Sequence, residues 1–265
     1  MANFSQILPS ELKCFITLAT KSKRPIATDW LKNGKTFANA KADSTNVGLI
    51  LGEQSGILDI DLDCRETKAL VDIMLPEAIA VFDRGSADSG HYLFRASSFG
   101  PRKTFNSEGV KSTLVELRGD GSQTMIPPSV HPNGEALVFT SSNLNAPEVR
   151  YEDLFKSVNL LAACSEIAQN WREGHRHDLA LAFAGLCLKQ DVEHNLVTQI
   201  VQRICDINGD LDVDDRLNAI RTSYAQSADS LLGYNGLVDC LGQSKAKRIA
   251  DRIAAYSSQE FSSDI

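Results

Sequence analysis

The sequence predicts an α+β protein whose first part is built on β-strands and whose second part is entirely α-helical. Two observations predict this division. Up to about Leu154, short runs of β-branched and aromatic residues alternate with turn residues, and only one or two segments have the spacing of a helix. From about Ser157 onward, apolar residues recur with the period of an α-helix. We therefore expect two domains, residues 1–156 and residues 157–265.

The predicted strands of the first part are short and are bounded by turn residues. In chain order they cover Phe15–Leu18, Val47–Leu51, Ile57–Leu62, Ile79–Phe82, His91–Phe94, Leu114–Arg118, Gln123–Ile126 and Leu137–Thr140. We expect the last of them to close a hairpin. Apolar residues spaced for one face predict a helix over Glu66–Leu75, and Ile26–Leu31 is expected to open a helix or a turn.

The strand over Ile57–Leu62 has the most informative pattern, because apolar and acidic residues alternate along it. Residues i and i+2 of a strand lie on one face, roughly 6–7 Å apart. Asp59 and Asp61 therefore point one way, while Leu58 and Ile60 point into a core. Two neighbouring carboxylates repel each other, and a divalent cation such as Mg²⁺ relieves that repulsion. The alternative is an exposed acidic face on an edge strand.

The composition argues against several classes of protein. A net charge of −7 argues against a basic coat for nucleic acid, although it is compatible with a local basic groove. The chain has no run of about 18 apolar residues and no signal-peptide pattern, so we expect a soluble, cytoplasmic protein that does not act at a membrane. The six cysteines contain no Cys-x-x-Cys pair, which argues against a zinc ribbon and favours buried free thiols.

Basic residues gather in the opening segment. Up to Lys41, seven Lys and Arg residues face only Glu11 and Asp29. Such a segment can follow a phosphate backbone, so Lys23 and Arg24 are candidate contacts to a template or primer strand. A solvated surface is the alternative.

The second part contains five segments with helix-period apolar residues. They cover Asn159–Arg172, Asp178–Lys189, Asn195–Ile207, Asp214–Gln226 and Lys245–Tyr256. Asp178 and Asp214 lie where an acidic residue suits a first turn, and Gly174 and Gly209 lie near helix ends. We therefore expect an all-α domain joined to the first near residues 155–160.

Three pieces of the first part carry residue types that suit phosphoryl transfer: the Asp59/Asp61 pair, Ser89-Gly90-His91 at a strand start, and Glu116 on a third strand. Three carboxylates can hold one or two divalent metals, which activate a 3′-hydroxyl and clamp a triphosphate. A histidine behind a Ser-Gly turn can hydrogen-bond a phosphate, although a structural role is the alternative for a lone histidine. Further candidate phosphate contacts are Arg84, Lys111 and Arg118.

Four motifs, taken in their order along the chain, resemble one protein family. They are Asn46 to Gly52 (Asn-Val-Gly-Leu-Ile-Leu-Gly), Gly56 to Asp61 (Gly-Ile-Leu-Asp-Ile-Asp), Ser89 to Phe94 (Ser-Gly-His-Tyr-Leu-Phe), and Val115 to Gly134, which contains Pro-Pro-Ser-Val-His-Pro. Together they resemble the bifunctional primase/polymerase (prim-pol) branch of the archaeo-eukaryotic primase superfamily, whose members show an hhhDhD motif, an sGH motif and a third acidic strand. Upstream, Lys23-Arg24-Pro25 and Trp30 also look like the N-terminal portion of the family, and the resemblance covers about residues 5–150.

The resemblance implies an archaeo-eukaryotic primase-like catalytic domain, with an RNA-recognition-motif-like core and a second α/β unit. By motif match, Asp59, Asp61 and Glu116 would be the catalytic acids and would bind Mg²⁺ or Mn²⁺. His91, with Ser89 and Gly90, would bind the phosphates of the incoming nucleotide. The third acid is often Asp in the family; Glu116 is longer but chemically equivalent. Asp88 precedes Ser89 where many members carry glycine, which puts a negative charge near the expected triphosphate.

The segment from Glu173 to Leu186 is similar to the helical domain that follows the catalytic core in many mobile-element and phage primases. In such proteins the helical part is thought to assist the binding of template, primer or initiating nucleotide. The candidate residues for this role are Arg172, His175, Arg176 and His177. An ordinary helix N-terminus with basic surface residues is the alternative.

These observations predict a template-dependent DNA primase/polymerase that joins nucleoside triphosphates on single-stranded DNA by two-metal catalysis, in the replication of a mobile element or phage. One alternative is a replication-initiator or DNA-binding module with weak or no polymerase activity. Another is a metal-dependent phosphatase or nuclease that uses the same carboxylates. Because no Gly-x-x-x-x-Gly-Lys-Ser/Thr loop occurs, we expect either a partner replicative helicase or a longer polypeptide of which this is the front part.

Overall fold

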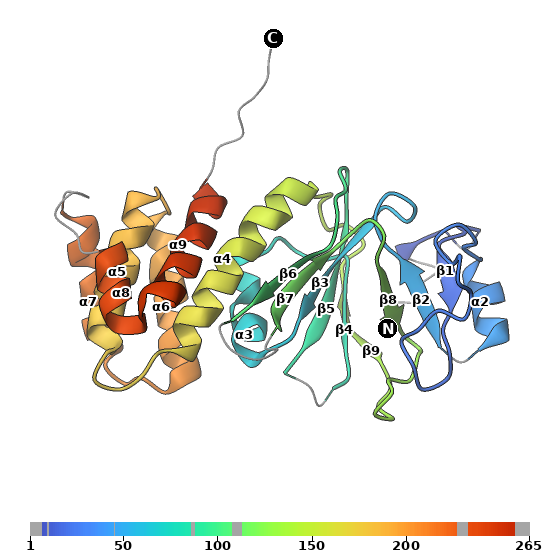
Figure 1. Cartoon of the computed structure of the whole chain (residues 1–265), viewed down its shortest axis with the longest axis horizontal. Coiled ribbons are helices and arrows are strands. Elements are labelled where there is room, and N and C mark those ends of the chain that lie inside the picture. Colours follow the sequence, from blue (N-terminus) through green and yellow to red (C-terminus); the bar gives the residue numbers. More distant parts are fainter. Residues whose placement is uncertain are drawn as a thin grey trace, which may run out of the picture. The chain divides into compact units, whose positions relative to one another are not determined.

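A computed structural model of the chain describes residues 7–9, 11–44, 46–85, 88–107, 113–226 and 233–257 (Figure 1). The described residues fall into two compact units. The first lies within Met1–Lys68, Pro76–Phe105 and Thr113–Leu154, and the second lies within Ala69–Leu75, Asn106–Ser112 and Phe155–Ile265. Antiparallel sheets are followed by helices, so the α+β class expected from the sequence is confirmed.

The first unit contains two antiparallel sheets. The smaller has the order β1-β2-β8, and its strands are β1 (Phe15–Thr17), β2 (Val47–Ile50) and β8 (Gln123–Ile126). The larger has the order β6-β7-β3-β5-β4-β9. Its strands are β3 (Ile57–Leu62), β4 (Ala80–Asp83), β5 (Gly90–Arg95), β6 (Lys103–Asn106), β7 (Thr113–Arg118) and β9 (Val138–Ser142).

The middle of the larger sheet has the order of a split β-α-β unit. Helix α3 (Arg65–Met74) connects β3 to β4, and β5 pairs antiparallel with both strands between them. β7 pairs with the other side of β3, so that β3 is a central strand. The alternative of an acidic edge strand is therefore wrong for Asp59 and Asp61.

Alternation along β3 divides its residues between two faces. Leu58, Ile60 and Leu62 occupy one face and are fully buried. Ile57, Asp59 and Asp61 occupy the other. The register places Leu93 of β5 opposite Asp59. Ile57 and Leu93 belong to the hydrophobic cluster that also contains the side chains of the three-stranded sheet. The acidic face of β3 therefore begins in a core between the two sheets and ends in a polar region.

The hairpin expected to close at Leu137–Thr140 is formed only at Leu137, whose N–H donates to the Ser129 carbonyl at 2.9 Å beside the Val130–Ala136 bridge. β8 pairs with β2 in the smaller sheet, whereas β9 pairs with β4 in the larger one. Pro127 and Pro128 follow β8 and have no N–H with which to continue a ladder. The next residue, Ser129, binds β2 instead: its Oγ accepts from the Val47 N–H at 2.9 Å.

Two short elements of the first unit were not expected from the sequence. Helix α2 (Phe37–Asp43) has seven residues and begins at Thr36, whose Oγ1 accepts from the Asn39 N–H at 3.4 Å. β6 has one buried side chain, Phe105, so it lacks apolar alternation. Residues 26–31 form turns rather than a helix.

The helices after β9 match the predicted segments, with one addition. They are α4 (Tyr151–Gln169), α5 (Arg176–Lys189), α6 (His194–Asn208), α7 (Val213–Tyr224), α8 (Tyr234–Leu241) and α9 (Gln243–Ser257). The eight-residue α8 was not predicted. α4 begins at Tyr151 and runs through the expected junction, and the division at residues 156 and 157 stays a prediction.

None of the helices in the described ranges has both the length and the apolar character that crossing a membrane requires. All six cysteines are free thiols, and Cys14, Cys164, Cys187 and Cys205 are buried.

Candidate active site

Strand register brings the residues singled out from the sequence onto one surface. Asp61 of β3 lies directly opposite His91 of β5 on one side and Glu116 of β7 on the other. Asp59 lies opposite Arg118 in the same way. Directly opposed residues of neighbouring strands have Cβ atoms roughly 4.5–5.5 Å apart. Five side chains from three strands therefore form one cluster.

His91 bridges the two aspartates. Its Nδ1 lies 3.0 Å from Asp59 Oδ2, and its Nε2 lies 3.5 Å from Asp61 Oδ1. The Phe82 ring stacks on the imidazole with centroids 4.7 Å apart, and Thr124 Oγ1 lies 3.4 Å from Nδ1. These contacts fix the plane of the histidine ring.

The charges of this cluster shift the pKa values of its members. Burial alone would lower the pKa of His91, but the carboxylates of Asp61 and Asp59 outweigh burial and raise it. Burial alone would raise the pKa of Asp59, but His91 and Arg118 outweigh it and hold the pKa below its usual value. Both shifts favour the imidazolium–carboxylate pair, so the cluster presents a positive charge on His91.

Arg118 contacts all three predicted catalytic acids. Its Nε donates to Glu116 Oε2 at 2.7 Å, its Nη2 also pairs with Asp61, and its Nη1 lies 3.9 Å from Asp59 Oδ2. The neighbouring carboxylates outweigh the effect of burial and raise the pKa of Arg118 further. Its guanidinium is therefore a permanent cation among the three carboxylates.

Glu116 is held on both of its oxygens. Oε1 accepts from Arg102 and, at 3.1 Å, from Thr104 Oγ1, while Oε2 accepts from Arg118. Burial alone would raise the pKa of Glu116, but Arg118 and Arg102 outweigh it and lower the pKa. The carboxylate stays ionised and fixed in direction.

The donor set of this cluster fits a hard divalent cation. Asp59, Asp61 and Glu116 offer carboxylate oxygens, the ligands that Mg²⁺ and Mn²⁺ prefer. The guanidinium of Arg118 occupies a position between them, so the structure itself shows a cationic group at that place. In the part of the chain that the structure describes, no three His, Cys, Asp or Glu side chains are grouped so that they could hold a metal ion directly. A cation bound by all three acids would replace contacts that Arg118 makes.

A cleft opens beside the cluster and is lined by residues of both sheets. Its cationic lining comes from Lys23, Arg84, His91 and Arg118. Asp61 and Asp63 line it as well. Partial burial, together with the charges of Asp61 and Glu116, raises the pKa of Asp63 to about 6. The cleft thus combines an acidic wall with basic residues, the pairing that cation-bound phosphates require.

The turn before β5 is tied to the cleft by side chains. Arg84 Nη2 donates to Ser89 Oγ at 3.0 Å. Lys68 Nζ donates to Asp83 Oδ2 at 3.1 Å and to the Ser89 carbonyl at 3.4 Å. Ser89 and Gly90 both line the cleft beside His91. The Ser-Gly-His segment is therefore held next to the acids, as the sequence led us to expect.

The other predicted phosphate and strand contacts are distributed differently. Lys23 lines the cleft, and Arg24 is exposed but is not part of the lining. Lys111 lies outside the described residues. Four predicted contacts belong to the helical unit, at and before the start of α5: Arg172, His175, Arg176 and His177.

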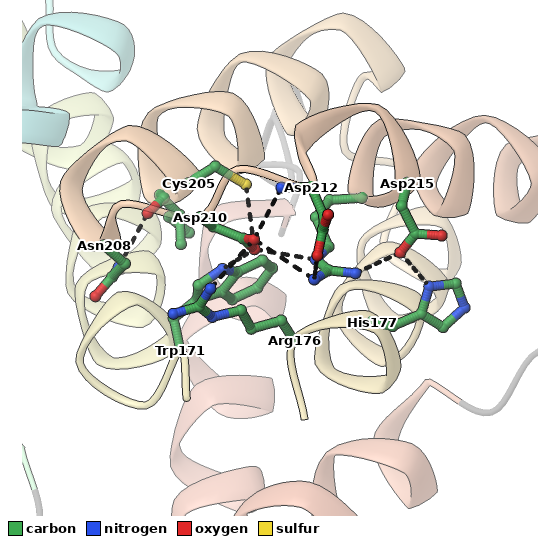
Figure 2. Close-up of polar contacts among 10 residues, drawn as sticks. Trp171, Arg176, His177, Cys205, Asn208, Asp210, Asp212 and Asp215 are labelled. Carbon is green, nitrogen blue, oxygen red and sulfur yellow. Dashed lines mark hydrogen bonds and ion pairs between the residues drawn. The ribbon is translucent and has the colours of Figure 1, made fainter. Parts of the chain in front are cut away.

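In the helical unit, Arg176 belongs to a network around the buried Asp210 (Figure 2). Arg176 Nη1 lies 3.2 Å from Asp210 Oδ1, and Trp171 Nε1 donates to Asp210 Oδ2 at 2.9 Å. Arg216 Nε donates to Asp210 Oδ2 at 3.0 Å. His177 is exposed and pairs with Asp215 at 2.7 Å. Arg176 and His177 thus have partners within their own unit, and their role in DNA binding stays a prediction.

Sequence reasoning missed several residues of the site. Arg102, Thr104 and Thr124 contact Glu116 or His91, and Lys68 holds the turn that contains Ser89. Thr124 lies within the fourth motif, Val115 to Gly134, and could have been singled out there. Arg102 and Thr104 lie in a segment without a pattern, and Lys68 lies on a predicted helix whose pattern does not mark it, so these contacts follow from the fold alone.

Comparison with known proteins agrees with this geometry. A family model described as bifunctional DNA primase/polymerase, N-terminal, matches residues 7–150, which is more than half of the chain. A comparison with curated proteins finds no match. The matched range contains both sheets and every residue of the acidic cluster. The chain therefore belongs to the Prim-Pol family, whose members are metal-dependent nucleotidyltransferases that act on DNA and nucleotides.

Proposed function

We propose that the chain is a template-dependent DNA primase/polymerase that joins nucleoside triphosphates on single-stranded DNA at the cleft beside β3. The observation that carries the proposal is the convergence of Asp59, Asp61 and Glu116 with His91 and Arg118 on three adjacent strands. Acids that hold a cation and bases that hold phosphates are the two components that phosphoryl transfer needs side by side.

In this proposal Asp59, Asp61 and Glu116 hold Mg²⁺ or Mn²⁺. One or two such cations supply the charge that activates a 3′-hydroxyl and stabilises the departing pyrophosphate. Arg118 lies within reach of the same acids, so it keeps them ionised and apart before the cation binds. Once released from the carboxylates, its guanidinium can bind phosphate oxygens with the same donors.

The phosphates of the incoming nucleotide would lie beside the acids, against His91 and the Ser89-Gly90 turn. The raised pKa of His91 favours an imidazolium, which attracts a phosphate oxygen and donates a hydrogen bond to it. Ser89, Gly90 and Arg84 border the same space, where a small turn lets backbone N–H groups approach an anion. Lys23 adds a further cation to the lining.

The template and primer would contact Lys23 and Arg24 of the first unit. Arg172, His175, Arg176 and His177 of the helical unit remain proposed contacts, and Lys111 remains a proposed phosphate contact. Replication of a phage or mobile element, and a helicase partner, are the setting that we propose for the activity.

Synthesis on circular single-stranded DNA tests the proposal. Purified protein is incubated with labelled nucleotides and Mg²⁺ or Mn²⁺, beside an Asp59→Ala/Asp61→Ala variant. We expect short products from the native chain and none from the variant. Products from both proteins would contradict the assignment of the acids, and products only from a preformed primer would restrict the activity to extension.

The second candidate is a replication-initiator or DNA-binding module with weak or no polymerase activity. The observation that favours it is that Arg118, Arg102 and His91 pair with the three acids, so that the cluster has counter-charges without a metal ion. DNA binding without synthesis, both with and without a primer, would support this candidate.

A further inference from the structure

A hollow of about 230 Å³ lies at the outer edge of β1, where Ile26 and Lys35 bond to that strand, outside the proposed active site. Its walls include Ile16, Ile26, Ala27 and the ring of Trp30, and Lys35 is the cation among its lining residues. Ile26 is 61% exposed although its side chain is entirely apolar. An apolar and aromatic hollow with a lysine at its rim has the composition of a small-ligand site.

One lining residue of the hollow and one of the catalytic cleft belong to the same row of paired residues in the three-stranded sheet. Ile16 pairs with Gly48, and Gly48 pairs with Met125, so these three positions share one face. Ile16 lines the hollow and Met125 lines the cleft. Two strand spacings separate them, about 10 Å. Gly48, in the middle, has no side chain to divide the row.

Gln123 covers the space above Gly48. A Cβ at position 48 would lie 2.7 Å from Gln123 Oε1 and 2.9 Å from Ile16 Cγ1. Gln123 Oε1 is buried and accepts no hydrogen bond from the residues that the structure describes. This buried acceptor lies over Gly48, between the row positions of Ile16, which lines the hollow, and Met125, which lines the cleft.

A short extended segment links the same two sites along the edge of β1. Lys23 lines the cleft, and Ile26 lines the hollow three residues later. Gln123 Nε2 donates to the Lys23 carbonyl at 2.9 Å, and the Ile26 N–H donates to the Thr17 carbonyl at 3.1 Å. The segment is therefore held in place at both ends. An extended ligand bound along this segment would reach from one site to the other.

The charge around the hollow suits a polyanion with apolar faces. Lys35 lines the hollow, Lys23, Arg24 and Lys32 lie near it in the sequence, and the side chain of Asp29 is bound by Asn33 Nδ2. Lysine is depleted in the centres of protein–protein interfaces, which argues against a protein partner. Single-stranded nucleic acid is bound by basic grooves with aromatic side chains on which bases stack.

We propose that this hollow receives an unpaired base of the single-stranded DNA template, with Trp30 as the stacking surface and the adjoining phosphates along Lys23 to Ile26. The inference rests on the proposed function, because it assigns the template of that reaction to a site about 10 Å from the cleft. Trp30 is a binding residue in this assignment and takes no part in the chemistry.

Binding of a labelled single-stranded oligonucleotide, measured by fluorescence anisotropy without nucleotides or divalent cations, tests the inference. Trp30→Ala should weaken binding roughly 10-fold or more, in line with the loss of one stacked base, whereas Trp30→Phe should retain most of the affinity. An oligonucleotide with abasic sites should bind the native chain more weakly, and Trp30→Ala should not weaken that binding further. Equal affinity of Trp30→Ala and the native chain for the intact strand would overturn the inference.

A second variant guards against a folding defect in Trp30→Ala. Ile26→Glu places a negative charge at an exposed position of the rim and should also weaken binding. Leu144→Glu makes the same kind of change at another exposed apolar residue and is the matched control, for which we expect native affinity. An equal effect of the two variants would contradict a local site.

The binding assay also separates this inference from the proposed function. If the native chain makes no product but binds DNA in a base-dependent way, the proposed polymerase function is overturned. The proposed binding of a template base in the hollow then still holds. If Trp30→Ala still synthesises DNA and binds the template with native affinity, only the proposed binding of a base in the hollow is overturned.

Discussion

Arg118 pairs with all three acids of the site, although two of them lie far from it in the sequence. Its guanidinium contacts Glu116 and Asp61 directly and lies 3.9 Å from Asp59. Three carboxylates so close together would repel one another without a cation between them. Arg118 therefore stabilises the fold in the absence of a metal ion and competes with a metal ion for the same oxygens.

Replacement of Arg118 tests this competition. Arg118→Gln removes the cation that pairs with all three carboxylates, so the variant should unfold at a lower temperature than the native chain in buffer without divalent cations. Added Mn²⁺ binds the folded state and raises the unfolding temperature by mass action. We expect this increase to be larger in Arg118→Gln than in the native chain, as measured by differential scanning fluorimetry.

The matched control is Arg24→Gln, which removes an exposed cation outside the cleft and should leave the response to Mn²⁺ unchanged. A response to Mn²⁺ that is absent from all three proteins would argue against a cation site at these acids.

Sequence patterns predicted some of these residues and not others, for a physical reason. The two-residue alternation of side chains along a strand depends only on neighbouring residues. This alternation therefore correctly predicted that Asp59 and Asp61 share one face. The position of Arg118 between them depends on the pairing of β3 with β7, which brings together residues more than fifty positions apart. Arg102 reaches Glu116 from a segment with no periodic pattern, so no local signal marks it.

At the scale of elements, β7 depends on a close approach of two backbones at its end. A Cβ on Gly119, the residue after β7, would collide with the Gly100 carbonyl oxygen. The Asp120 N–H donates to the same carbonyl at 2.8 Å, so the two segments cannot separate without the loss of this bond. The direction of Arg118, one residue earlier, is fixed by this contact.

Gly119→Ala should therefore lower the unfolding temperature, because the contact is with backbone and not with a flexible side chain. Gly90→Ala is the matched control: its Cβ would meet its nearest neighbours at 3.8 Å, an ordinary contact distance. Thermal unfolding followed by circular dichroism measures both. A smaller loss of stability in Gly119→Ala than in Gly90→Ala would contradict the close approach.

Element prediction succeeded where periodicity extends over many residues or where a strand is buried. β3 and β8 have the predicted bounds, and α5 and α6 begin within two residues of the predicted starts. α2 and β6 are short or mostly exposed and carry little periodic signal. The predicted hairpin forms only at Leu137, because β9 pairs with β4 rather than with the segment before it.

At the scale of the whole molecule, the helical unit has a buried polar centre of its own. Asp210, between α6 and α7, binds Trp171 after α4, Arg176 at the start of α5, and Arg216 of α7 (Figure 2). Burial alone would raise the pKa of Asp210, but hydrogen bonds from Arg216 and Trp171 outweigh it and lower the pKa. The charged carboxylate is therefore favoured in the folded state.

This shift predicts how the stability of the helical unit depends on pH. A carboxylate with a lowered folded-state pKa contributes stability above its unfolded value, about 3.9, and loses it as the pH falls through the folded-state pKa. Asp210→Asn should cost about 3 kcal/mol at pH 7, as expected when a buried ion pair loses one partner. The difference from the native chain should shrink as the pH approaches 3, in denaturation curves followed by circular dichroism.

Asp251→Asn is the control for this measurement, because Asp251 forms an exposed ion pair with Lys247 and should contribute little. A difference between Asp210→Asn and the native chain that stays constant from pH 7 to pH 3 would contradict the assigned role of the Asp210 charge.

The central claim is that Asp61 belongs to a cation site for nucleotide transfer, and the rate of nucleotide incorporation on a primed template tests it most directly. Asp61→Asn should lower kcat about 100-fold or more, the loss typical of removing one group that stabilises transition-state charge. Asp63→Asn, two residues further along the chain and also in the cleft, should retain most of the native rate. Native activity in Asp61→Asn, with the fold intact by circular dichroism, would contradict the claim.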